Sequence, residues 1–236
     1  MQPKIFAAAL FSFAALGAAD FKPAPKGLLM RPETCNAKSP DRFRARFRTT
    51  QGDFVIEVTR AWAPNGSDRF YNLVRNRWYD DNFFYDISPN SIVKFGISST
   101  PVLNKTWTVR ATNINDDPAK FKTNALGYVS FDQDGMNSRT TRILVNLAEN
   151  SKLDLQGIRP IGMVVEGLEV LKKMQAAKID TAKLTADGGD FVKKTSPQAM
   201  QIRSAVIEKE EIFAPKPAAP AAKPAAPAPA KTVKKK

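Results

Sequence analysis

The sequence predicts a mainly β domain, a closed antiparallel barrel capped by two helices. Short apolar strand patterns recur through the middle of the chain, with turn residues between them. Two further segments place apolar residues at helical spacing, and no internal repeat is visible. Many short strands with few helices are typical of a closed antiparallel barrel whose ends the helices cover.

The first 19 residues have the layout of a secretory signal peptide. Lys4 is their only charged residue, residues 5–19 form an apolar run, and Gly17 and Ala19 are small residues before a cut ahead of Asp20. A membrane-spanning helix is the alternative, but it needs roughly 20 apolar residues. We therefore expect a secreted or periplasmic protein, cleaved after Ala19, with no transmembrane span.

Two segments flanking the predicted domain have few large apolar residues. Residues 20–41 are rich in proline and lysine and predict a linker. Residues 214–236 contain only Ala, Pro, Lys, Thr and Val, with six prolines, six lysines and no acid. We expect this basic tail to be disordered and solvated. It could tether the protein to an anionic surface, or it could serve only as a solubilising tail.

The domain is predicted over residues 42–180 and begins with a hairpin. Residues 43–48 alternate apolar and charged side chains, residues 51–53 form a turn, and residues 54–58 form the second strand. Pro64 marks the start of the first helix. Further strands are predicted at residues 83–87, 92–97, 128–131 and 143–147.

The rest of the domain is less regular. Residues 98–124 are long and polar and are predicted as a loop region, and residues 164–174 are predicted as the second helix. Residues 181–213 are predicted as a C-terminal extension of the domain. Within it, residues 199–208 could form either a final strand or a helix.

The composition excludes several kinds of enzyme. The chain has no histidine and one cysteine, Cys35, so it cannot build a histidine-based nucleophile system, a histidine zinc site or an internal disulfide. Residues 132–135 resemble the start of a calcium loop, but the glycine comes early and no glutamate closes the loop. Without the one lysine of residues 1–19 and the six of the tail, 29 basic residues face 23 acidic ones. The body is therefore only mildly basic, which gives no support for specific nucleic-acid binding.

Several segments nevertheless follow one another in a recognisable order: residues 49–58, 62–74, 79–81, 95–97, 116–118, 136–141 and 162–167. Together they resemble the cyclophilin-type peptidyl-prolyl cis-trans isomerases, in a bacterial branch, over about residues 43–174. The resemblance implies an eight-stranded antiparallel barrel with a helix at each end.

The resemblance also implies an activity, rotation about an Xaa-Pro peptide bond, whose uncatalysed barrier is about 18–20 kcal/mol. The family uses an arginine that donates a hydrogen bond near the prolyl bond, an apolar pocket for the proline ring, and amide side chains that hold the peptide backbone. It needs no histidine, metal or cofactor, so we predict none. The implied partners are proline-containing or extended polypeptide segments.

Most functional positions of the family carry other residue types here. Counting from the motifs on either side places Asp86 at the position of the catalytic arginine. Leu153 matches the family pocket. The substrate-binding positions are otherwise taken by Ser91 and Ile92 for Phe and Met, Lys94 for Gln, Gln133 for Asn, Arg142 for a second Gln, Leu144 for a second Phe, and Ile158 for His or Phe.

Two hypotheses follow from these replacements. A carboxylate at position 86 accepts hydrogen bonds and cannot donate them, which opposes the family mechanism and predicts an exported binding module with weak or lost catalysis. Alternatively, Arg142 replaces the usual arginine in an active isomerase, oriented by an ion pair between Asp86 and Lys94. A surface ion-pair cluster without function, worth about 0–1 kcal/mol, is the third interpretation of this trio.

The pocket positions also leave an alternative open. Ile92, Leu144 and Leu153 could fill the vacated groove as core residues. The protein would then be an interaction module that uses another face, such as the loop at residues 98–124. An open groove in the structure would favour peptide binding instead.

Overall fold

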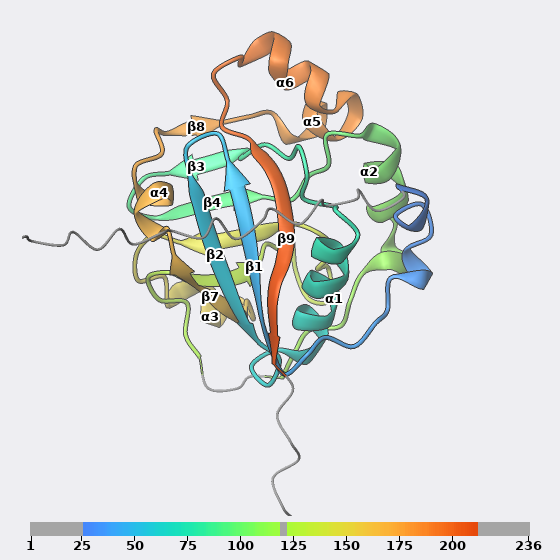
Figure 1. Cartoon of the computed structure of the whole chain (residues 1–236), viewed down its shortest axis with the longest axis vertical. Helices are drawn as coiled ribbons and strands as arrows, with labels where there is room; N and C mark the ends of the chain where they lie inside the picture. Colours follow the sequence, from blue (N-terminus) through green and yellow to red (C-terminus); the bar gives the residue numbers. More distant parts are fainter. Residues whose placement is uncertain (1–25, 119–121, 212–236) are drawn as a thin grey trace, which may run out of the picture.

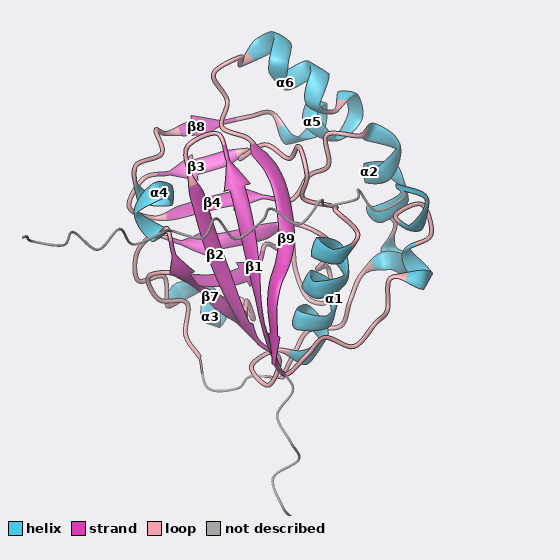
Figure 2. Cartoon of the chain, viewed as in Figure 1, coloured by secondary structure: helices cyan, strands magenta, loops and turns pink. Residues whose placement is uncertain are grey.

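A computed structural model of the chain describes residues 26–118 and 122–211 (Figure 1). The predicted signal peptide and the basic tail lie outside the described residues. Nine strands form a single sheet, all of their pairings are antiparallel, and helices surround it (Figure 2). The prediction of a mainly β, antiparallel fold is confirmed.

The elements follow the sequence pattern closely in the first half of the domain. The strands are β1 (Arg42–Thr49), β2 (Asp53–Thr59), β3 (Asp86–Ser88), β4 (Ile92–Phe95), β5 (Tyr128–Phe131), β6 (Ile143–Asn146), β7 (Pro160–Glu166), β8 (Ala177–Lys178) and β9 (Ile202–Glu211). The helices are α1 (Pro64–Arg75), α2 (Pro101–Trp107), α3 (Lys152–Leu155), α4 (Leu168–Lys172), α5 (Thr181–Asp187) and α6 (Gly189–Thr195), with short 3-10 turns η1 (Lys26–Leu28), η2 (Pro32–Thr34) and η3 (Arg110–Thr112).

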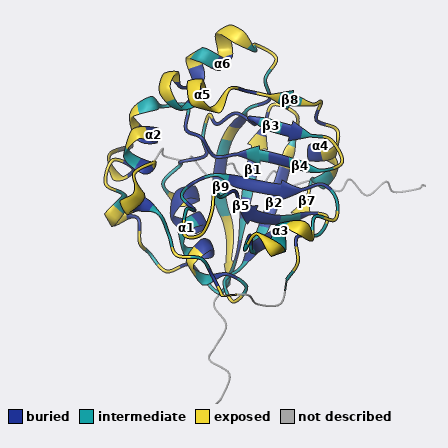
Figure 3. Ribbon diagram, turned by 180° about the vertical axis from the view of Figure 1, so that it is seen from behind, coloured by how far each residue is buried: buried dark blue, intermediate teal, exposed yellow. Residues whose placement is uncertain are grey.

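The sheet curls around one core. In Figure 1, β2, β1 and β9 run nearly vertically in front, while β3 and β4 cross behind them at a steep angle. The rings of Phe47 on β1 and Phe95 on β4 lie 5.5 Å apart, so the two crossing halves pack directly on each other. Seen from behind, strand β5 is largely buried, whereas helix α6 is largely exposed (Figure 3).

The predicted closed, eight-stranded barrel is wrong in both respects. The sheet has nine strands in the order β8-β3-β4-β6-β5-β7-β2-β1-β9, with β8 and β9 as its two edges. The short strand β8 pairs with the outer edge of β3, at Asp86 and Ile87, so β3 has no free edge there for β9. Only a single bridge, between Phe83 and Gln201, links the two ends of the sheet in the described part of the chain.

The helix predictions are partly wrong as well. Two helices were predicted, and the described residues hold six. The first prediction corresponds to α1, which begins at Pro64 as expected. The second, over residues 164–174, combines the end of strand β7 with the short helix α4. Gly167 separates these elements at a φ of +76°, and a Cβ there would lie 2.2 Å from the carbonyl oxygen of Asp53.

The segments predicted as irregular contain ordered structure. Residues 98–124 were predicted as a loop, but they include α2 and η3, and Trp107 at the end of α2 is buried. In the extension, α5 and α6 bury Leu184 and Val192 beside Phe83 in a second, smaller core. Of the two alternatives for residues 199–208, the strand is observed, as part of β9.

Residues 26–41, the described part of the predicted linker, pack against the domain. Trp107 donates from Nε1 to the carbonyl oxygen of Leu29 at 2.7 Å, and the Asn72 side chain exchanges two hydrogen bonds with the backbone of Ala37. Cys35 is a buried free thiol. Within residues 26–118 and 122–211, none of the helices combines the length and apolarity that a membrane span requires.

Candidate functional site

Most of the predicted site residues lie around one cavity of about 570 Å³, which we call the strand cavity. Ser91 is the exception, since it belongs to the turn between β3 and β4 and donates from its backbone N–H to Ser88. The predicted residues that line the strand cavity are Asp86, Ile92, Lys94, Gln133, Arg142, Leu144, Leu153 and Ile158.

Strand pairing brings distant parts of the sequence together at this cavity. Asp86 on β3 lies directly opposite Lys94 on β4, and Lys94 lies directly opposite Leu144 on β6. Residues that oppose each other in neighbouring strands point to the same face of a sheet. The three side chains therefore form one row across the sheet. Helix α3 adds Leu153 from one side of the cavity, and residues 178–181 line it as well.

The cavity is open above an apolar floor. Leu144 and Ile158 are buried, while Ile92 and Leu153 are half-buried. Its volume lies within the range of about 300–1,000 Å³ that is usual for ligand pockets. Ile92, Leu144 and Leu153 thus line the groove without filling it, so the structure does not show the alternative in which they act only as core.

Asp132 is the centre of the charges in the strand cavity. Its Oδ1 lies 2.9 Å from Lys94 Nζ, its Oδ2 accepts a hydrogen bond of 3.1 Å from the Tyr85 hydroxyl, and Arg142 Nε lies 3.8 Å from the same oxygen. The Asp132 side chain is only 11% exposed. Burial, reinforced by this carboxylate, raises the pKa of Tyr85 well above its ordinary value, so the phenol stays a donor.

A second carboxylate holds the other end of Arg142. Arg142 Nη2 lies 2.5 Å from Asp134 Oδ2, and the Arg142 side chain is 26% exposed. Burial alone would lower the pKa of Arg142, but the carboxylates of Asp132 and Asp134 raise it above its ordinary value. Arg142 is therefore permanently charged, and it is held between two acids.

The expected ion pair between Asp86 and Lys94 is not formed. Among the described residues, Lys94 pairs with Asp132, and the Asp86 carboxylate accepts a hydrogen bond of 3.4 Å from the Ser88 hydroxyl. The physical reason is that Asp132, at the end of β5, offers a more buried carboxylate with two further donors around it. The trio is thus replaced by a cluster of Lys94, Arg142, Asp132 and Asp134.

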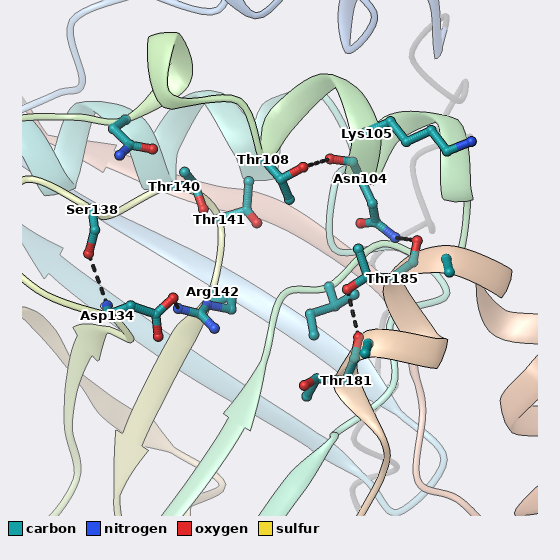
Figure 4. Close-up of a pocket in the computed structure, with 14 residues that line it drawn as sticks. Asn104, Lys105, Thr108, Asp134, Ser138, Thr140, Thr141, Arg142, Thr181 and Thr185 are labelled. Atoms are coloured by element: carbon teal, nitrogen blue, oxygen red, sulfur yellow. Dashed lines mark hydrogen bonds and ion pairs between the residues drawn. The ribbon is translucent and has the colours of Figure 1, made fainter.

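A second cavity of about 590 Å³ adjoins the first, and we call it the threonine cavity. Asp134, Arg142 and Thr181 line both cavities. Figure 4 shows Arg142 reaching toward Asp134 at one end of the threonine cavity, with Thr181 of α5 opposite. Arg142 therefore lies at the boundary between an apolar-floored cavity and one lined mainly by hydroxyl and amide groups.

Sequence reasoning missed part of the cavity lining, namely Tyr85, Asp132, Asp134, Gln156, Lys178, Ile179, Asp180 and Thr181. Asp132 and Asp134 flank the predicted Gln133, and this adjacency was the signal available for them. Residues 178–181 straddle the predicted end of the domain and offered no comparable signal. No set of three or more carboxylate or thiol side chains in the described residues is arranged to hold a metal ion.

The chain is similar in sequence to a known family and to several of its members. The family model described as "Cyclophilin type peptidyl-prolyl cis-trans isomerase/CLD" matches residues 44–207, which includes most of the predicted extension. A peptidyl-prolyl cis-trans isomerase of Acinetobacter baylyi is 24% identical over 132 residues, covering 54% of this chain and 69% of that protein. A peptidyl-prolyl cis-trans isomerase-like 1 of Gibberella zeae is 31% identical over 133 residues, covering 55% and 80%.

Solved structures share the fold at lower identity. A cyclophilin-type peptidyl-prolyl cis-trans isomerase of Cryptosporidium parvum superposes with a TM-score of 0.54 at 18% identity, covering 72% of this chain and 99% of that one. The same protein in the presence of the dipeptide Ala-Pro gives a TM-score of 0.53 at 17% identity, covering 71% and 99%. At such identities the likeness concerns the fold alone.

Proposed function

Because the chain belongs to the cyclophilin-type peptidyl-prolyl cis-trans isomerase family, we propose that it binds proline-containing or extended polypeptide segments in the strand cavity, with weak or lost isomerase catalysis. The observation that carries the proposal is an open, apolar-floored cavity lined by the carboxylate of Asp86. The sequence resemblance assigns this residue to the position of the family's arginine. The cavity supports binding. The carboxylate opposes the catalytic step.

The electrostatics of the cavity argue against efficient rotation of the peptide bond. Catalysis in this family requires a donor aimed at the prolyl amide as its resonance is lost. Asp86 presents only acceptors to that region. Arg142 is the alternative donor that the sequence suggested, but Asp134 binds one end of its guanidinium and Asp132 lies 3.8 Å from Nε. A cation that is already neutralised by two carboxylates exerts a weaker pull on a substrate carbonyl.

The same geometry suits a polypeptide ligand. Leu144, Ile158 and Leu153 provide an apolar surface for a proline ring, and Gln133 can hydrogen-bond a peptide backbone at the rim. The related Cryptosporidium protein, whose structure was determined in the presence of Ala-Pro, supports a proline-containing ligand for this fold. Extended segments of client polypeptides are therefore the proposed partners.

An active isomerase that uses Arg142 is the second candidate function. One observation favours it: Arg142 lines both cavities and is 26% exposed, so some of its N–H groups can face a bound peptide. In this version Asp132 and Asp134 orient the guanidinium and do not suppress it. The two versions differ in whether the rate depends on Arg142.

A protease-coupled assay with a proline-containing tetrapeptide separates the two versions. At micromolar protein we expect isomerisation at the uncatalysed rate in the wild type and in Arg142→Ala. An acceleration of tenfold or more that Arg142→Ala abolishes would overturn the proposal and establish the active form. An active cyclophilin, assayed in parallel, confirms that the coupling protease is not limiting.

Binding is measured separately, by titrating the same peptide. We expect Leu153→Ala to weaken binding, because truncation of a partly buried leucine removes about 1–3 kcal/mol of apolar contact. Leu155→Ala is the matched control: Leu155 lies on the same helix, is 90% exposed and does not line the cavity. Equal effects of the two substitutions would contradict binding in the strand cavity.

We further propose that the protein is exported and that its basic tail contacts an anionic surface. The signal-like pattern of residues 1–19 supports export, and the six lysines of residues 214–236, unbalanced by any acid, support the surface contact. Mass spectrometry of the mature protein tests export directly. An N-terminus at Asp20 is expected, and a retained Lys4 would contradict it.

A further inference from the structure

Arg69 differs from the other arginines whose pKa is perturbed. Hydrogen bonds that Arg44 donates to Glu57 and that Arg60 donates to Asp68 raise the pKa of those two arginines. Burial lowers the pKa of Arg69 to about 10. A partly buried guanidinium normally lies next to an acid, since a charge without a counter-charge is costly to remove from water. Among the described residues, Arg69 therefore lacks the carboxylate partner that Arg44 and Arg60 have.

The protein contacts of Arg69 confirm that its counter-charge is missing. Its guanidinium carbon lies 5.0 Å from the ring centre of Trp107, and its Nη1 donates a long hydrogen bond of 3.4 Å to the carbonyl oxygen of Thr140. Trp107 is itself fixed by its bond to Leu29. None of the ion pairs in residues 26–118 and 122–211 involves Arg69. One face of the guanidinium is thus held in place, while most of its N–H groups donate no hydrogen bond to the described residues.

Two cavities meet at this guanidinium. One, of about 370 Å³, is lined mainly by asparagines, and we call it the asparagine cavity. The other, of about 490 Å³, lies between residues 32–36 and 106–112. Arg69, Cys35 and Asn36 line both cavities. No residue of the strand cavity lines either one, so this is a separate region of the molecule.

The other charged and titratable groups around these cavities do not neutralise Arg69. Asp68 also lines the asparagine cavity, but both of its oxygens already accept hydrogen bonds, from Arg60 and Ser39. Glu33 in the second cavity is exposed. Burial raises the pKa of the Cys35 thiol, which keeps it uncharged. Arg139 also lies near enough to act on Arg69, and its like charge adds to the unbalanced positive potential.

Further donors surround the guanidinium. The side-chain amides of Asn36 and Asn65 each use one N–H on a backbone carbonyl, of Glu33 and Asn115 respectively. Each amide has a second N–H that can donate a hydrogen bond to a ligand. The asparagine cavity holds a fixed guanidinium and amide donors, and its one acid, Asp68, is already paired. Such a pocket fits an oxyanion, because the guanidinium fork matches the spacing of carboxylate and phosphate oxygens.

We propose that Arg69 anchors a binding site for a small oxyanion, a carboxylate or a phosphate, which enters through the asparagine cavity and is held by the guanidinium together with the amides of Asn36 and Asn65. The ligand supplies the counter-charge that the described residues do not provide. This site is independent of peptide binding and does not require isomerase activity.

The test is an NMR titration of the full-length protein with sodium phosphate at constant ionic strength, with sodium chloride as the reference salt and sodium acetate as a second arm. We expect saturable shifts of the backbone amides of Asn36, Asn65 and Asn113 at low millimolar phosphate, and none with chloride. Saturation by acetate alone would assign the site to carboxylates, and saturation by phosphate alone to phosphates. The proposal fails if neither anion saturates.

Two variants establish the role of the guanidinium. We expect Arg69→Gln to weaken binding at least tenfold. Arg75→Gln is the matched control, since Arg75 lies on the same helix and stacks on Tyr71 but lines neither cavity, and it should bind as the wild type does. Should Arg69→Gln fail to fold, Arg69→Lys keeps the charge without the fork and should bind at least threefold more weakly. Unchanged affinity in the folded Arg69 variant overturns the proposal.

Discussion

Two of the clusters of carboxylates and arginines in the described residues differ in what surrounds them. One, which we call the cap cluster, joins Asp117 and Arg139 to the start of α1. The other joins Asp132 and Asp134 to Lys94 and Arg142. In the cap cluster the side chains of Asp117 and Arg139 are 0% and 2% exposed. In the second cluster, Arg142 is 26% exposed and faces two cavities.

The cap cluster supplies what the start of α1 lacks locally. The residue before the helix is Ala63, which has no side-chain oxygen to accept the free N–H groups of the first turn. Asp117, distant in sequence, accepts from Asn65 N at 2.7 Å and Gly66 N at 3.0 Å, and it pairs with Arg139 at 2.9 Å. Both oxygens of Asp117 are satisfied, which leaves this cluster no capacity for a ligand.

The number of charges in a cluster therefore does not indicate whether the cluster stabilises the fold or binds a ligand. A cluster that is enclosed by the protein stabilises the fold, whereas a cluster that borders an open cavity can exchange its partners with a ligand.

The largest effect is expected from Asp117→Ala. Removing one partner of a buried ion pair leaves the other charge uncompensated and costs about 3–5 kcal/mol. We expect a loss of this size in the free energy of unfolding, measured by urea denaturation. Asp116→Ala is the matched control, because Asp116 contacts the same arginine at 3.3 Å but is 25% exposed. It should cost about 1 kcal/mol or less, and equal losses would contradict the assignment.

A smaller effect, and of a different kind, is expected from Asp132→Asn. The amide can still accept the Tyr85 hydrogen bond, so we expect a stability loss of about 1–2 kcal/mol. The charge of the strand cavity changes by one unit, worth about 1 kcal/mol at short range in a hydrated site. A Glu-Pro peptide should therefore gain about fivefold in affinity, and a Lys-Pro peptide should lose about fivefold.

Titrations of the two peptides against the wild type and Asp132→Asn measure this preference. Asp180→Ala serves as a control for general loss of cavity charge, because Asp180 lines the cavity without pairing with Lys94 or Arg142. If Asp132→Asn loses stability as severely as Asp117→Ala and the peptide preference does not change, the second cluster is structural as well.

The smallest effect concerns pH and Asp68 of α1. Burial alone would raise the pKa of Asp68, but hydrogen bonds from Arg60 and Ser39 hold it below its ordinary value. A lowered folded-state pKa gives stability that is present above the unfolded pKa, about 3.9, and is lost as the pH falls. The difference in unfolding free energy between the wild type and Asp68→Asn should therefore be constant above about pH 5 and shrink below pH 4. A constant difference down to pH 2 would contradict the shift.

Local patterns predicted the elements that bury several apolar residues within a short segment. The hairpin of β1 and β2, the start of α1, and β5 and β6 agree with the structure to within one or two residues. Strand β7 was missed because apolar residues continue through it, and only Gly167 marks the change to helix α4. The two-residue strand β8 has no pattern of its own and depends entirely on pairing with β3.

The positions of the candidate site could be predicted from the sequence, but the ion pairs between its charged side chains could not. The resemblance placed its residues on neighbouring strands, and their pairing then brings them to one cavity. Which carboxylate Lys94 would reach could not be deduced from spacing, since Asp86 lies directly opposite it and Asp132 approaches from the end of β5. Three-dimensional packing decides between the two.

The central claim is that the strand cavity binds a proline-containing peptide without accelerating its isomerisation. NMR exchange spectroscopy of such a peptide, mixed with the isotope-labelled protein, measures both properties in one sample. We predict saturable shifts for the amides of Lys94, Gln133 and Arg142, with cis-trans exchange of the peptide at the uncatalysed rate. Exchange that is accelerated tenfold or more in the bound sample would contradict the account.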